Sequence, residues 1–481
     1  MGSLTALALL VSGYHPFAED AEIYLPGVEK ILNPKLFPVG QEFFLSHARM
    51  TLFPNLLALF LRITHLPMEV GLLLWQVASI YLLLLACWQL AGLFFPSQRA
   101  RWGGVCLVAA LLTIPVAGTA LYVMDQYLNP RNLAAFAGVF AVTRLLEKKY
   151  VRALLWLGFA ASMHPLMWVF PASFCLLFVV MERSEIWRTK SRMGAPTLMG
   201  GIVAITLASS ASDAYRQAAI RHGYLYIQNW RWYELLGIVA PLFLLWCFGR
   251  VAGVRKWKNL ERISRALMAY ELIYLGMALV FDLPSFETLA RIQPLRSLHF
   301  LYIILFVVLG GFLGEYVLRG RVCRWLSLFV PLSAGMFLAQ RSLFPSEAHL
   351  ELPGMAPRNP WVQAFVWIRG YTPTDAVFAL DPEYPKIHGE DRIGFRCMAE
   401  RSSLADAVKD GGVVSMFPSL AEEWWAQVKD QEPWRNLQRQ DFLRLQEKYG
   451  IRWVILQEPA AAGLGFDCPY GNDSVEVCRL P

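Results

Sequence analysis

The chain has 481 residues, of which 56% are hydrophobic and 17% are charged, whereas soluble domains average about 45–50% apolar and about 25% charged residues. Apolar runs of roughly 20 residues, the length that crosses a bilayer, recur as far as Gln340, which excludes a purely soluble globule. The net charge of +7 does not indicate nucleic-acid binding, because the basic residues lie in short clusters between apolar runs, as in membrane proteins.

The first apolar stretch, Met1–Gly13, is short for a membrane crossing. It lacks a basic n-region and an A-x-A cleavage site, which argues against a cleaved signal peptide. We therefore interpret it as a first transmembrane helix with a clipped start.

A polar first outer loop, residues 14–49, follows this stretch and carries Glu19, Asp20 and Glu22. Carboxylates at the mouth of a hydrophobic bundle cost free energy unless they are hydrated, paired or used. The apolar spacing over residues 20–32, ended by an Asn-Pro pair, predicts a short helix lying along the membrane interface.

Two interpretations of these acids stay open. In one, Asp20 only caps the following helix, where acids are favoured by the positive end of the helix dipole. In the other, a carboxylate takes a proton from an acceptor hydroxyl while a phosphate leaves, or the acids hold a divalent metal ion such as Mg²⁺ or Mn²⁺ against that phosphate. Capping does not exclude catalysis.

Further apolar runs predict roughly 11 to 13 membrane helices within residues 1–340. Basic clusters indicate the cytoplasmic turns, although the charges between residues 50 and 102 leave the topology there unresolved. The long run 151–181 has basic flanks at both ends, so we expect two helices that turn at His164-Pro165 on the outer side. The expected runs are 52–63, 70–95, 105–124, 133–146, 151–181, 197–209, 235–248, 266–281, 298–317 and 325–338.

The composition changes after residue 340. Residues 341–359 form a proline-rich linker, and residues 360–481 alternate helical and strand patterns, which is typical of a small soluble α/β domain. The basic clusters predict that this domain lies on the outer (periplasmic or extracytoplasmic) side of the membrane. We expect helices at 360–371, 404–409, 420–428 and 442–449, and strands at 376–380, 413–417, 451–456 and 474–480.

The first loop resembles that of the GT-C-type glycosyltransferases. These membrane enzymes use polyprenyl-phosphate-linked sugars and include protein O-mannosyltransferases, the aminoarabinose transferases that modify lipid A, and oligosaccharyltransferases. In that family the first outer loop opens with an acidic pair and a Tyr, then a short interfacial helix, as Glu19-Asp20-Ala-Glu-Ile-Tyr24 does here.

The order of parts downstream is also similar. A Pro-containing second span and an Arg-bearing turn precede an outer loop with an acid, here Asp125, and a later turn ends in Pro165. Related enzymes commonly carry Lys-Gly-Pro at that turn, where this chain has Met163-His164-Pro165. The resemblance covers residues 1–180 by motif order and the remainder by architecture. The Trp-Trp-Asp signature of oligosaccharyltransferases is absent from the tail, which argues against asparagine glycosylation.

The resemblance implies an enzyme of the plasma (inner) membrane that moves a sugar from a polyprenyl-phosphate donor to an unidentified glycan, lipid or protein acceptor on the outer side. Asp20 would be the general base and Glu19 or Glu22 a metal or acceptor ligand, while Arg131 offers planar bidentate donors to a phosphate. The expected site residues are Asp20 and Glu19 for catalysis and Glu22, Tyr24, Asp125, Arg131 and His164 for substrate binding.

Each of these residues also has a plainer interpretation. Asp125 and Arg131 can balance each other across an ordinary Asn-Pro turn, and His164 can be a satisfied residue at a helix end. His15 and His47 have the same status as His164. Several cations of the later loops are either phosphate contacts or solvated side chains: Arg216, Arg221, His222, Arg231, Arg291 and Arg296.

Cys468 and Cys478 flank a Gly-Asn-Asp turn in the tail. In an oxidising compartment they form a hairpin disulfide; in the alternative they are unpaired packing thiols. No Cys/His spacing indicates zinc.

The alternative to an enzyme is a non-catalytic membrane protein, a transporter or an envelope assembly factor, that shares the scaffold. A transporter is expected to carry ionisable groups near the middle of the membrane, whereas the polar residues here gather at one face. Acyl and phosphoethanolamine transferases need a buried catalytic His or a metal-bound Thr, and neither pattern is clear.

Overall fold

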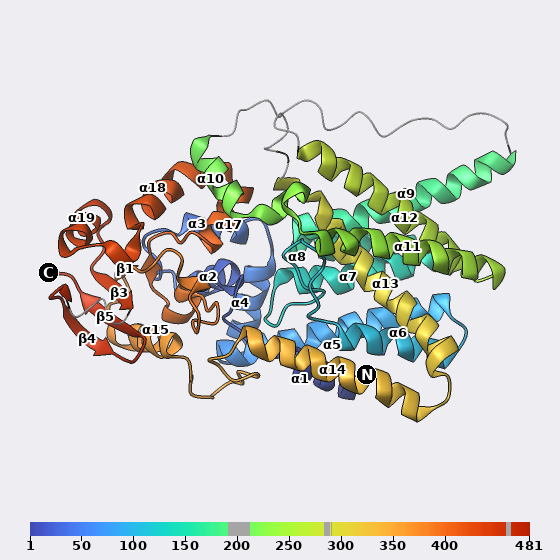
Figure 1. Ribbon diagram of the computed structural model, residues 1–481, viewed down its shortest axis with the longest axis horizontal. Coiled ribbons are helices and arrows are strands. Elements are labelled where there is room, and N and C mark those ends of the chain that lie inside the picture. Colours follow the sequence, from blue (N-terminus) through green and yellow to red (C-terminus); the bar gives the residue numbers. More distant parts are fainter. Residues whose placement is uncertain (191–211, 283–288, 290, 458–462) are drawn as a thin grey trace.

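The computed structural model describes residues 1–190, 212–282, 289, 291–457 and 463–481. Most long helices of the N-terminal part run along the long axis of the molecule, and the C-terminal domain lies at one end of them (Figure 1). The predicted helix at 197–209 lies outside the described residues.

The N-terminal part is helical throughout its regular elements. Its short turns of 3₁₀-helix are η1 (Gly223–Leu225), η2 (Ile227–Asn229) and η4 (Pro294–Arg296), and η5 (Leu313–Leu318) is a π-helical turn that continues α13. The α-helices are α1 (Gly2–Ser12), α2 (Ala21–Leu32), α3 (Glu42–Ala48), α4 (Phe53–Thr64), α5 (Met68–Phe94), α6 (Gln98–Ala110), α7 (Pro130–Leu146), α8 (Tyr150–Met163), α9 (Pro165–Lys190), α10 (Asp213–Arg221), α11 (Trp232–Val254), α12 (Lys258–Phe281), α13 (Ser297–Phe312) and α14 (Val322–Leu343).

Six described helices are long and apolar enough to cross a membrane: Met68–Phe94, Pro165–Arg183, Trp232–Val254, Lys258–Phe281, Pro294–Leu318 and Val322–Leu343. The bent pair α3 and α4 makes a seventh if it counts as one span. This is fewer than the 11 to 13 expected, in part because the apolar helices α1 and α8 have only 11 and 14 residues. The chain is a multi-pass membrane protein with a C-terminal soluble domain, as predicted.

The predicted run 105–124 is only partly a helix, because α6 ends at Ala110. The chain then folds back on itself in a short hairpin in which Pro115 pairs with Tyr122 and the Met124 N–H donates to the Leu112 carbonyl over 2.7 Å. Ala117 and Ala120 have positive φ values of 46° and 55° within this turn. A proline and a Gly-Thr-Ala turn overrode the apolar composition here, and the result is a loop that brings Asp125 to the end of the bundle.

The tightest helix packing described joins α6 and α13. A Cβ atom at Gly103 would lie 2.2 Å from the Gly310 carbonyl oxygen, so this pair of small residues lets the two backbones touch. Such small-residue contacts are the usual way helices approach in a bilayer, where burial of apolar surface does not drive association.

The C-terminal domain contains one five-stranded sheet with the strand order β2-β1-β3-β5-β4. β1 is parallel to β2 and β3, whereas β5 is antiparallel to β3 and β4. Its elements are α15 (Pro360–Tyr371), β1 (Val377–Ala379), η6 (Tyr384–Lys386), α16 (Phe395–Ala399), β2 (Ser402–Ser403), α17 (Lys409–Met416), η7 (Pro418–Leu420), α18 (Ala421–Gln431), η8 (Trp434–Asn436), α19 (Arg439–Tyr449), β3 (Trp453–Gln457), β4 (Asp467–Gly471) and β5 (Val475–Arg479).

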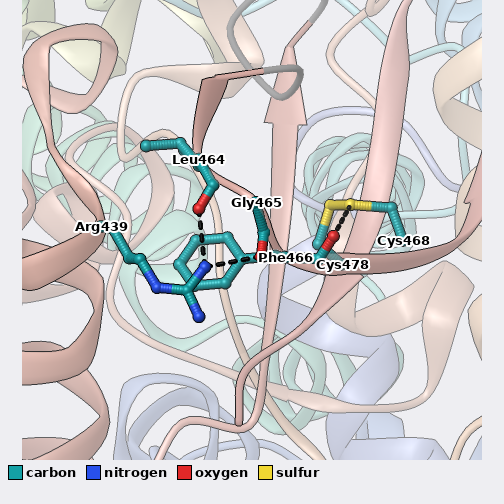
Figure 2. The surroundings of a disulfide bond; sticks show 6 residues. All are labelled: Arg439, Leu464, Gly465, Phe466, Cys468 and Cys478. Carbon is teal, nitrogen blue, oxygen red and sulfur yellow. Dashed lines mark hydrogen bonds between the residues drawn. A yellow bond between two sulfur atoms is a disulfide. The ribbon is translucent and has the colours of Figure 1, made fainter.

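The sheet edge at β4 is held by a covalent link. A disulfide joins Cys468 of β4 to Cys478 of β5, as one of the two sequence interpretations predicted (Figure 2). Arg439 of α19 donates to the Leu464 and Gly465 carbonyls over 2.8 and 2.6 Å and lies over the Phe466 ring, which ties the approach to β4 to the body of the domain (Figure 2).

Two predictions for the C-terminal domain were wrong. Residues 413–417, expected as a strand because of Val413 and Val414, belong to helix α17, and the helix expected at 404–409 does not form. The Asp406 carboxylate accepts the backbone N–H groups of Val408 and Lys409 over 2.7 and 2.5 Å and so begins α17 at Lys409. This local cap outweighs the strand preference of the β-branched residues.

Candidate functional site

A cavity of about 330 Å³ lies where one end of the helix bundle meets the C-terminal domain. Its walls come from the start of α2, from α3, from the loop after α6, from the start of α7, from η1 and η4, and from the segment 392–416 of the C-terminal domain. Among the predicted site residues, Glu19, Asp20, Tyr24, Asp125 and Arg131 line it. Residues far apart in the sequence therefore meet in one place, on the side of the molecule that carries the soluble domain.

Asp125 and Arg131 form a rigid pair at the base of this cavity. The Arg131 guanidinium donates to both Asp125 carboxylate oxygens over 2.8 to 3.1 Å, and the two side chains are 4% and 3% exposed. The backbone on both sides is fixed by buried amides, because Gln76 of α5 donates to the Asp125 carbonyl and Asn129 accepts the Arg131 N–H. The plainer interpretation of a balanced pair holds for these residues, and the pair lies in the cavity wall.

Asp20 and Glu19 stand opposite this pair within a network of cations. The Nη2 atom of Arg131, which also binds Asp125, lies 3.5 Å from Asp20 Oδ2. Lys409 Nζ lies 3.2 Å from Asp20 Oδ1. Lys409 also binds Glu19, and Arg392 binds Glu19 over 2.5 Å. The structure gives no side-chain capping bond for Asp20 at the start of α2, so its side chain is committed to the cavity rather than to the helix end.

The two aspartates differ in how readily they bind a proton. Burial opposes ionisation of Asp20, but Lys409 and Arg131 outweigh it and hold the pKa of Asp20 well below its usual range. For Asp125, burial is the stronger influence and raises the pKa to about 6, although Arg131 acts in the opposite direction. Both groups are predominantly charged at neutral pH.

His164 does not line the cavity but contacts Tyr24, which does. Its Nε2 is 3.3 Å from the Tyr24 hydroxyl, and its Nδ1 accepts the Met167 N–H over 3.3 Å. Since Nδ1 is an acceptor, the ring proton sits on Nε2 and is donated to the Tyr24 oxygen. The Tyr24 hydroxyl is thus left free to donate its own proton into the cavity.

Arg296 is the one cavity cation whose guanidinium has no carboxylate partner among the described residues. Its Nε is buried without a hydrogen-bond partner, and its guanidinium lies 5.7 Å from the centre of the Tyr224 ring. The cavity therefore has four cationic side chains, from Arg131, Arg296, Arg392 and Lys409, against three carboxylates. This surplus of positive charge in a partly buried space favours an anionic ligand.

Glu22, which was expected to bind substrate, faces away from the cavity. Its carboxylate accepts the backbone N–H groups of Arg396 and Cys397 over 3.0 and 3.1 Å. A Cβ atom at Gly394 would lie 2.5 Å from Glu22 Oε2, so only glycine allows this approach. Burial raises the pKa of Glu22 to about 7, against the effect of Arg396. Glu22 thus joins α2 to the C-terminal domain.

Arg221, one of the open alternatives, also joins the two parts of the molecule. It binds Glu383 over 2.7 Å and Glu432 over 2.9 Å. Its neighbours His222 and Tyr224 line the cavity instead.

Lys409 and Arg392 are the site residues that the sequence analysis missed. They are isolated cations in the soluble domain with no motif around them, and only the docking of that domain brings them to Glu19. The backbone also takes part, because Ala18 pairs with Ile393 and the Glu19 N–H donates to the Arg392 carbonyl over 2.7 Å. Glu19 and Arg392 both have positive φ values, 56° and 57°. Such strain persists only where the surroundings hold it, and it is commonly found at functional sites.

A second cavity of about 480 Å³ lies behind this strained segment. It shares Glu19, Arg392, Val408 and Lys409 with the first cavity, so these residues form a wall between the two spaces. The rest of its lining comes from the end of α14 and from the segment 385–391 of the C-terminal domain.

The cavity does not fit a divalent metal ion as its residues are arranged. Magnesium and manganese sites need several carboxylate or carbonyl oxygens that point at one empty position, whereas both Asp20 and Asp125 point at Arg131. Elsewhere in the described part of the chain, only Cys468, Glu476 and Cys478 have a metal-like spacing, and a disulfide joins the two cysteines.

Comparisons with known proteins identify the fold. No family model matches the chain, and no curated protein matches it by sequence. Among solved structures, the chain is similar to the archaeal oligosaccharyltransferase AglB from Archaeoglobus fulgidus, solved with an inhibitory peptide and a dolichol-phosphate, at a TM-score of 0.50 and 11% identity over 95% of this chain and 69% of that chain. The apo form of the A. fulgidus oligosaccharyltransferase gives a TM-score of 0.47 at 11% identity over the same shares. The chain has the fold of the GT-C glycosyltransferases, in a divergent form, as the resemblance predicted.

Proposed function

We propose that this protein is a membrane glycosyltransferase that transfers a sugar from a polyprenyl-phosphate donor to an acceptor on the outer side of the plasma (inner) membrane. The observation that carries the proposal is the meeting of Asp20, Asp125 and Arg131 with the unpaired Arg296 in one cavity at the end of the helix bundle. The structural neighbour solved with a dolichol-phosphate supports the class of donor.

The donor phosphate is assigned to the cationic side of the cavity. Arg296 has no carboxylate to balance it, and Tyr24 has a hydroxyl proton to donate. A guanidinium and a neutral hydroxyl suit the oxygens of a phosphate, because charge-assisted hydrogen bonds are stronger than neutral ones. The apolar helices behind the cavity hold the isoprenoid tail in this proposal.

The acceptor is assigned to the side of the C-terminal domain. The second cavity lies there behind the wall of Glu19, Arg392, Val408 and Lys409, and its lining combines charged side chains such as Lys386 and Asp391 with apolar ones. In this proposal the acceptor hydroxyl approaches Asp20 from the C-terminal-domain side of the first cavity, which Lys409 and Arg392 line. Glu19 keeps Lys409 and Arg392 in place in this arrangement.

In the reaction, the acceptor oxygen forms a bond to the anomeric carbon of the sugar, and the bond from that carbon to the phosphate oxygen breaks. The acceptor proton passes to the Asp20 carboxylate, and the polyprenyl phosphate leaves with the electron pair. General-base catalysis of this kind contributes about 10²–10⁴-fold to a rate.

Donor binding makes Asp20 a better base. Lys409 and Arg131 hold the pKa of Asp20 low in the protein alone, and a bound phosphate offsets the charge of these two cations. The pKa of Asp20 then rises towards the pH of the surroundings, where a carboxylate accepts a proton more readily. The base is thereby strengthened only when a donor is present.

The test is turnover of a panel of polyprenyl-phosphate sugars by the purified full-length protein in lipid nanodiscs, with a membrane extract as the source of acceptor. Release of free polyprenyl phosphate reports the reaction without knowledge of the acceptor. We expect Asp20→Asn to lower kcat by about 10²–10⁴-fold. Asp213→Asn is the matched control, because Asp213 is 99% exposed outside the cavity.

Two results contradict the proposal. Equal turnover by wild type and Asp20→Asn removes the assigned base. Turnover of no donor by a folded wild-type protein removes the enzyme and leaves a non-catalytic scaffold, either a transporter or an envelope assembly factor.

A further inference from the structure

Arg131 lies where two carboxylates from distant parts of the chain face each other. One nitrogen of its guanidinium, Nη2, is 2.8 Å from Asp125 Oδ2 and 3.5 Å from Asp20 Oδ2. Two carboxylates that converge on a single point from two outer loops are a typical arrangement for holding a divalent cation against a phosphate. Here the point of convergence is a side chain of the protein.

We propose that Arg131 is the built-in cation of this site, and that its guanidinium occupies the position between Asp20 and Asp125 that a divalent metal ion would otherwise take. The proposal deepens the proposed function, because it implies transfer from the lipid phosphate without a metal ion. It also implies that a cation site is latent in the chain and is blocked by one side chain.

The remaining oxygens of the two carboxylates are also engaged. Asp20 Oδ1 lies against Lys409 Nζ at 3.2 Å, and Asp125 Oδ1 accepts from Arg131 Nη2 over 2.9 Å. Each of the four carboxylate oxygens therefore lies against a cationic nitrogen. A hexacoordinate ion needs free oxygens at about 2.0–2.1 Å, and this pair offers none while Arg131 is present.

The backbone keeps Arg131 in this position. The Asp125 N–H donates to Asn132 over 3.3 Å, and Asn132 in turn donates to the Tyr127 carbonyl over 3.0 Å, so the loop and the first turn of α7 are one unit. Gln76 of α5 closes this unit from below by binding both the Asp125 carbonyl and Asn132. A metal ion would have to displace a buried, bidentate guanidinium from this framework.

The charge of the cavity points in the same direction. Four cations already face three carboxylates, and a divalent ion would increase this surplus. A bound phosphate decreases this surplus of positive charge, because a phosphate is an anion.

The test measures binding of Mn²⁺ to the purified full-length protein in detergent by the loss of the free-ion paramagnetic resonance signal. We expect no stoichiometric binding of Mn²⁺ by wild type. We expect Arg131→Met to bind one Mn²⁺ per chain, with a Kd at least tenfold below that of any residual binding by wild type. Adding Asp125→Asn to Arg131→Met is expected to abolish that binding. Arg49→Met is the matched control, because Arg49 pairs with Glu42 on the exposed surface and is expected to behave as wild type.

Binding of one Mn²⁺ per wild-type chain, abolished by Asp20→Asn, would overturn the proposal. So would a folded Arg131→Met protein that binds no Mn²⁺, because the carboxylates would then lack affinity for a cation irrespective of Arg131. The wild-type measurement holds even if Arg131→Met does not fold. None of these readouts requires turnover, so failure of the proposed glycosyl transfer is seen separately.

Discussion

In two clusters within the described part of the chain, a buried arginine lies between two carboxylates. In the first, Arg131 lies 2.8 Å from Asp125 and 3.5 Å from Asp20. In the second, Arg396 lies 2.6 Å from Asp410 and 3.5 Å from Glu22. Both clusters connect the start of α2 with residues distant in sequence, and their distances are nearly the same.

The clusters differ in what surrounds the more distant carboxylate. Glu22 is 2% exposed and its oxygens are taken by backbone N–H groups, whereas the Asp20 side chain is 28% exposed and faces a cavity with a surplus cation. The same three charges therefore give a closed joint in one place and a candidate reaction site in the other. The comparison teaches that exposure to the cavity, rather than the identity of the charged residues, distinguishes the candidate reaction site from the structural cluster.

The largest effect is expected from a substitution in the cluster of Arg396, Asp410 and Glu22, which is closed to solvent. Arg396→Met leaves Asp410 and Glu22 buried without their cation, and removing one partner of a buried pair costs about 3–5 kcal/mol. We expect a large fall in the apparent melting temperature of the protein in detergent, measured by intrinsic fluorescence. The exposed variant Arg49→Met provides the control. An unchanged melting temperature would show that the joint does not hold the domains together.

The second prediction concerns Arg296, the additional cation of the cavity that contains Asp20, Asp125 and Arg131. Arg296→Met is expected to raise the KM for the polyprenyl-phosphate donor about 10–100-fold, because one hydrogen bond to a charged group is worth about 1.5–3 kcal/mol. The melting temperature should change little, since Arg296 has no carboxylate to leave unpaired among the described residues. Arg231→Met is the matched control on the same side. A fall in stability without a change in KM would place Arg296 with the structural cations.

The smallest expected effect is the dependence of stability on pH that Glu22 causes. Burial raises the pKa of Glu22 from 4.5 to about 7, so its contribution to stability is full below pH 4.5 and is lost as the pH rises through 7. Glu22→Gln lacks this loss. Wild type and variant should therefore melt alike at pH 4, and wild type should be less stable by about 1–3 kcal/mol at pH 8. A constant gap between the two proteins at both pH values would contradict this.

Local patterns in the sequence were sufficient for much of the fold and for several residues that line the candidate site. The helix expected over residues 20–32 forms as Ala21–Leu32, and the turn at His164-Pro165 separates α8 from α9. Asp20, Asp125 and Arg131 could be singled out because each follows or precedes an apolar run, where a charge is costly unless it is used.

Tertiary contacts decided the rest. The loop after Ala110 is apolar enough for a span, yet Met124 binds back to Leu112 and turns it into a wall of the cavity. Lys409 and Arg392 carry no local signal, and their role appears only when the C-terminal domain docks. The direction of Glu22 depends on Gly394, 372 positions later in the printed sequence.

The backbone bridge between Ala18 and Ile393 has a consequence for biogenesis. The loop that contains Ala18 emerges early in translation, but the segment around Ile393 that pairs with it, and Lys409 beyond it, emerge only when most of the chain has been made. Until then the loop lacks the partners that shape the cavity. A nascent or truncated chain would insert its helices but would still have an incomplete cavity. The cavity is therefore complete only after the C-terminal domain has folded against the helices.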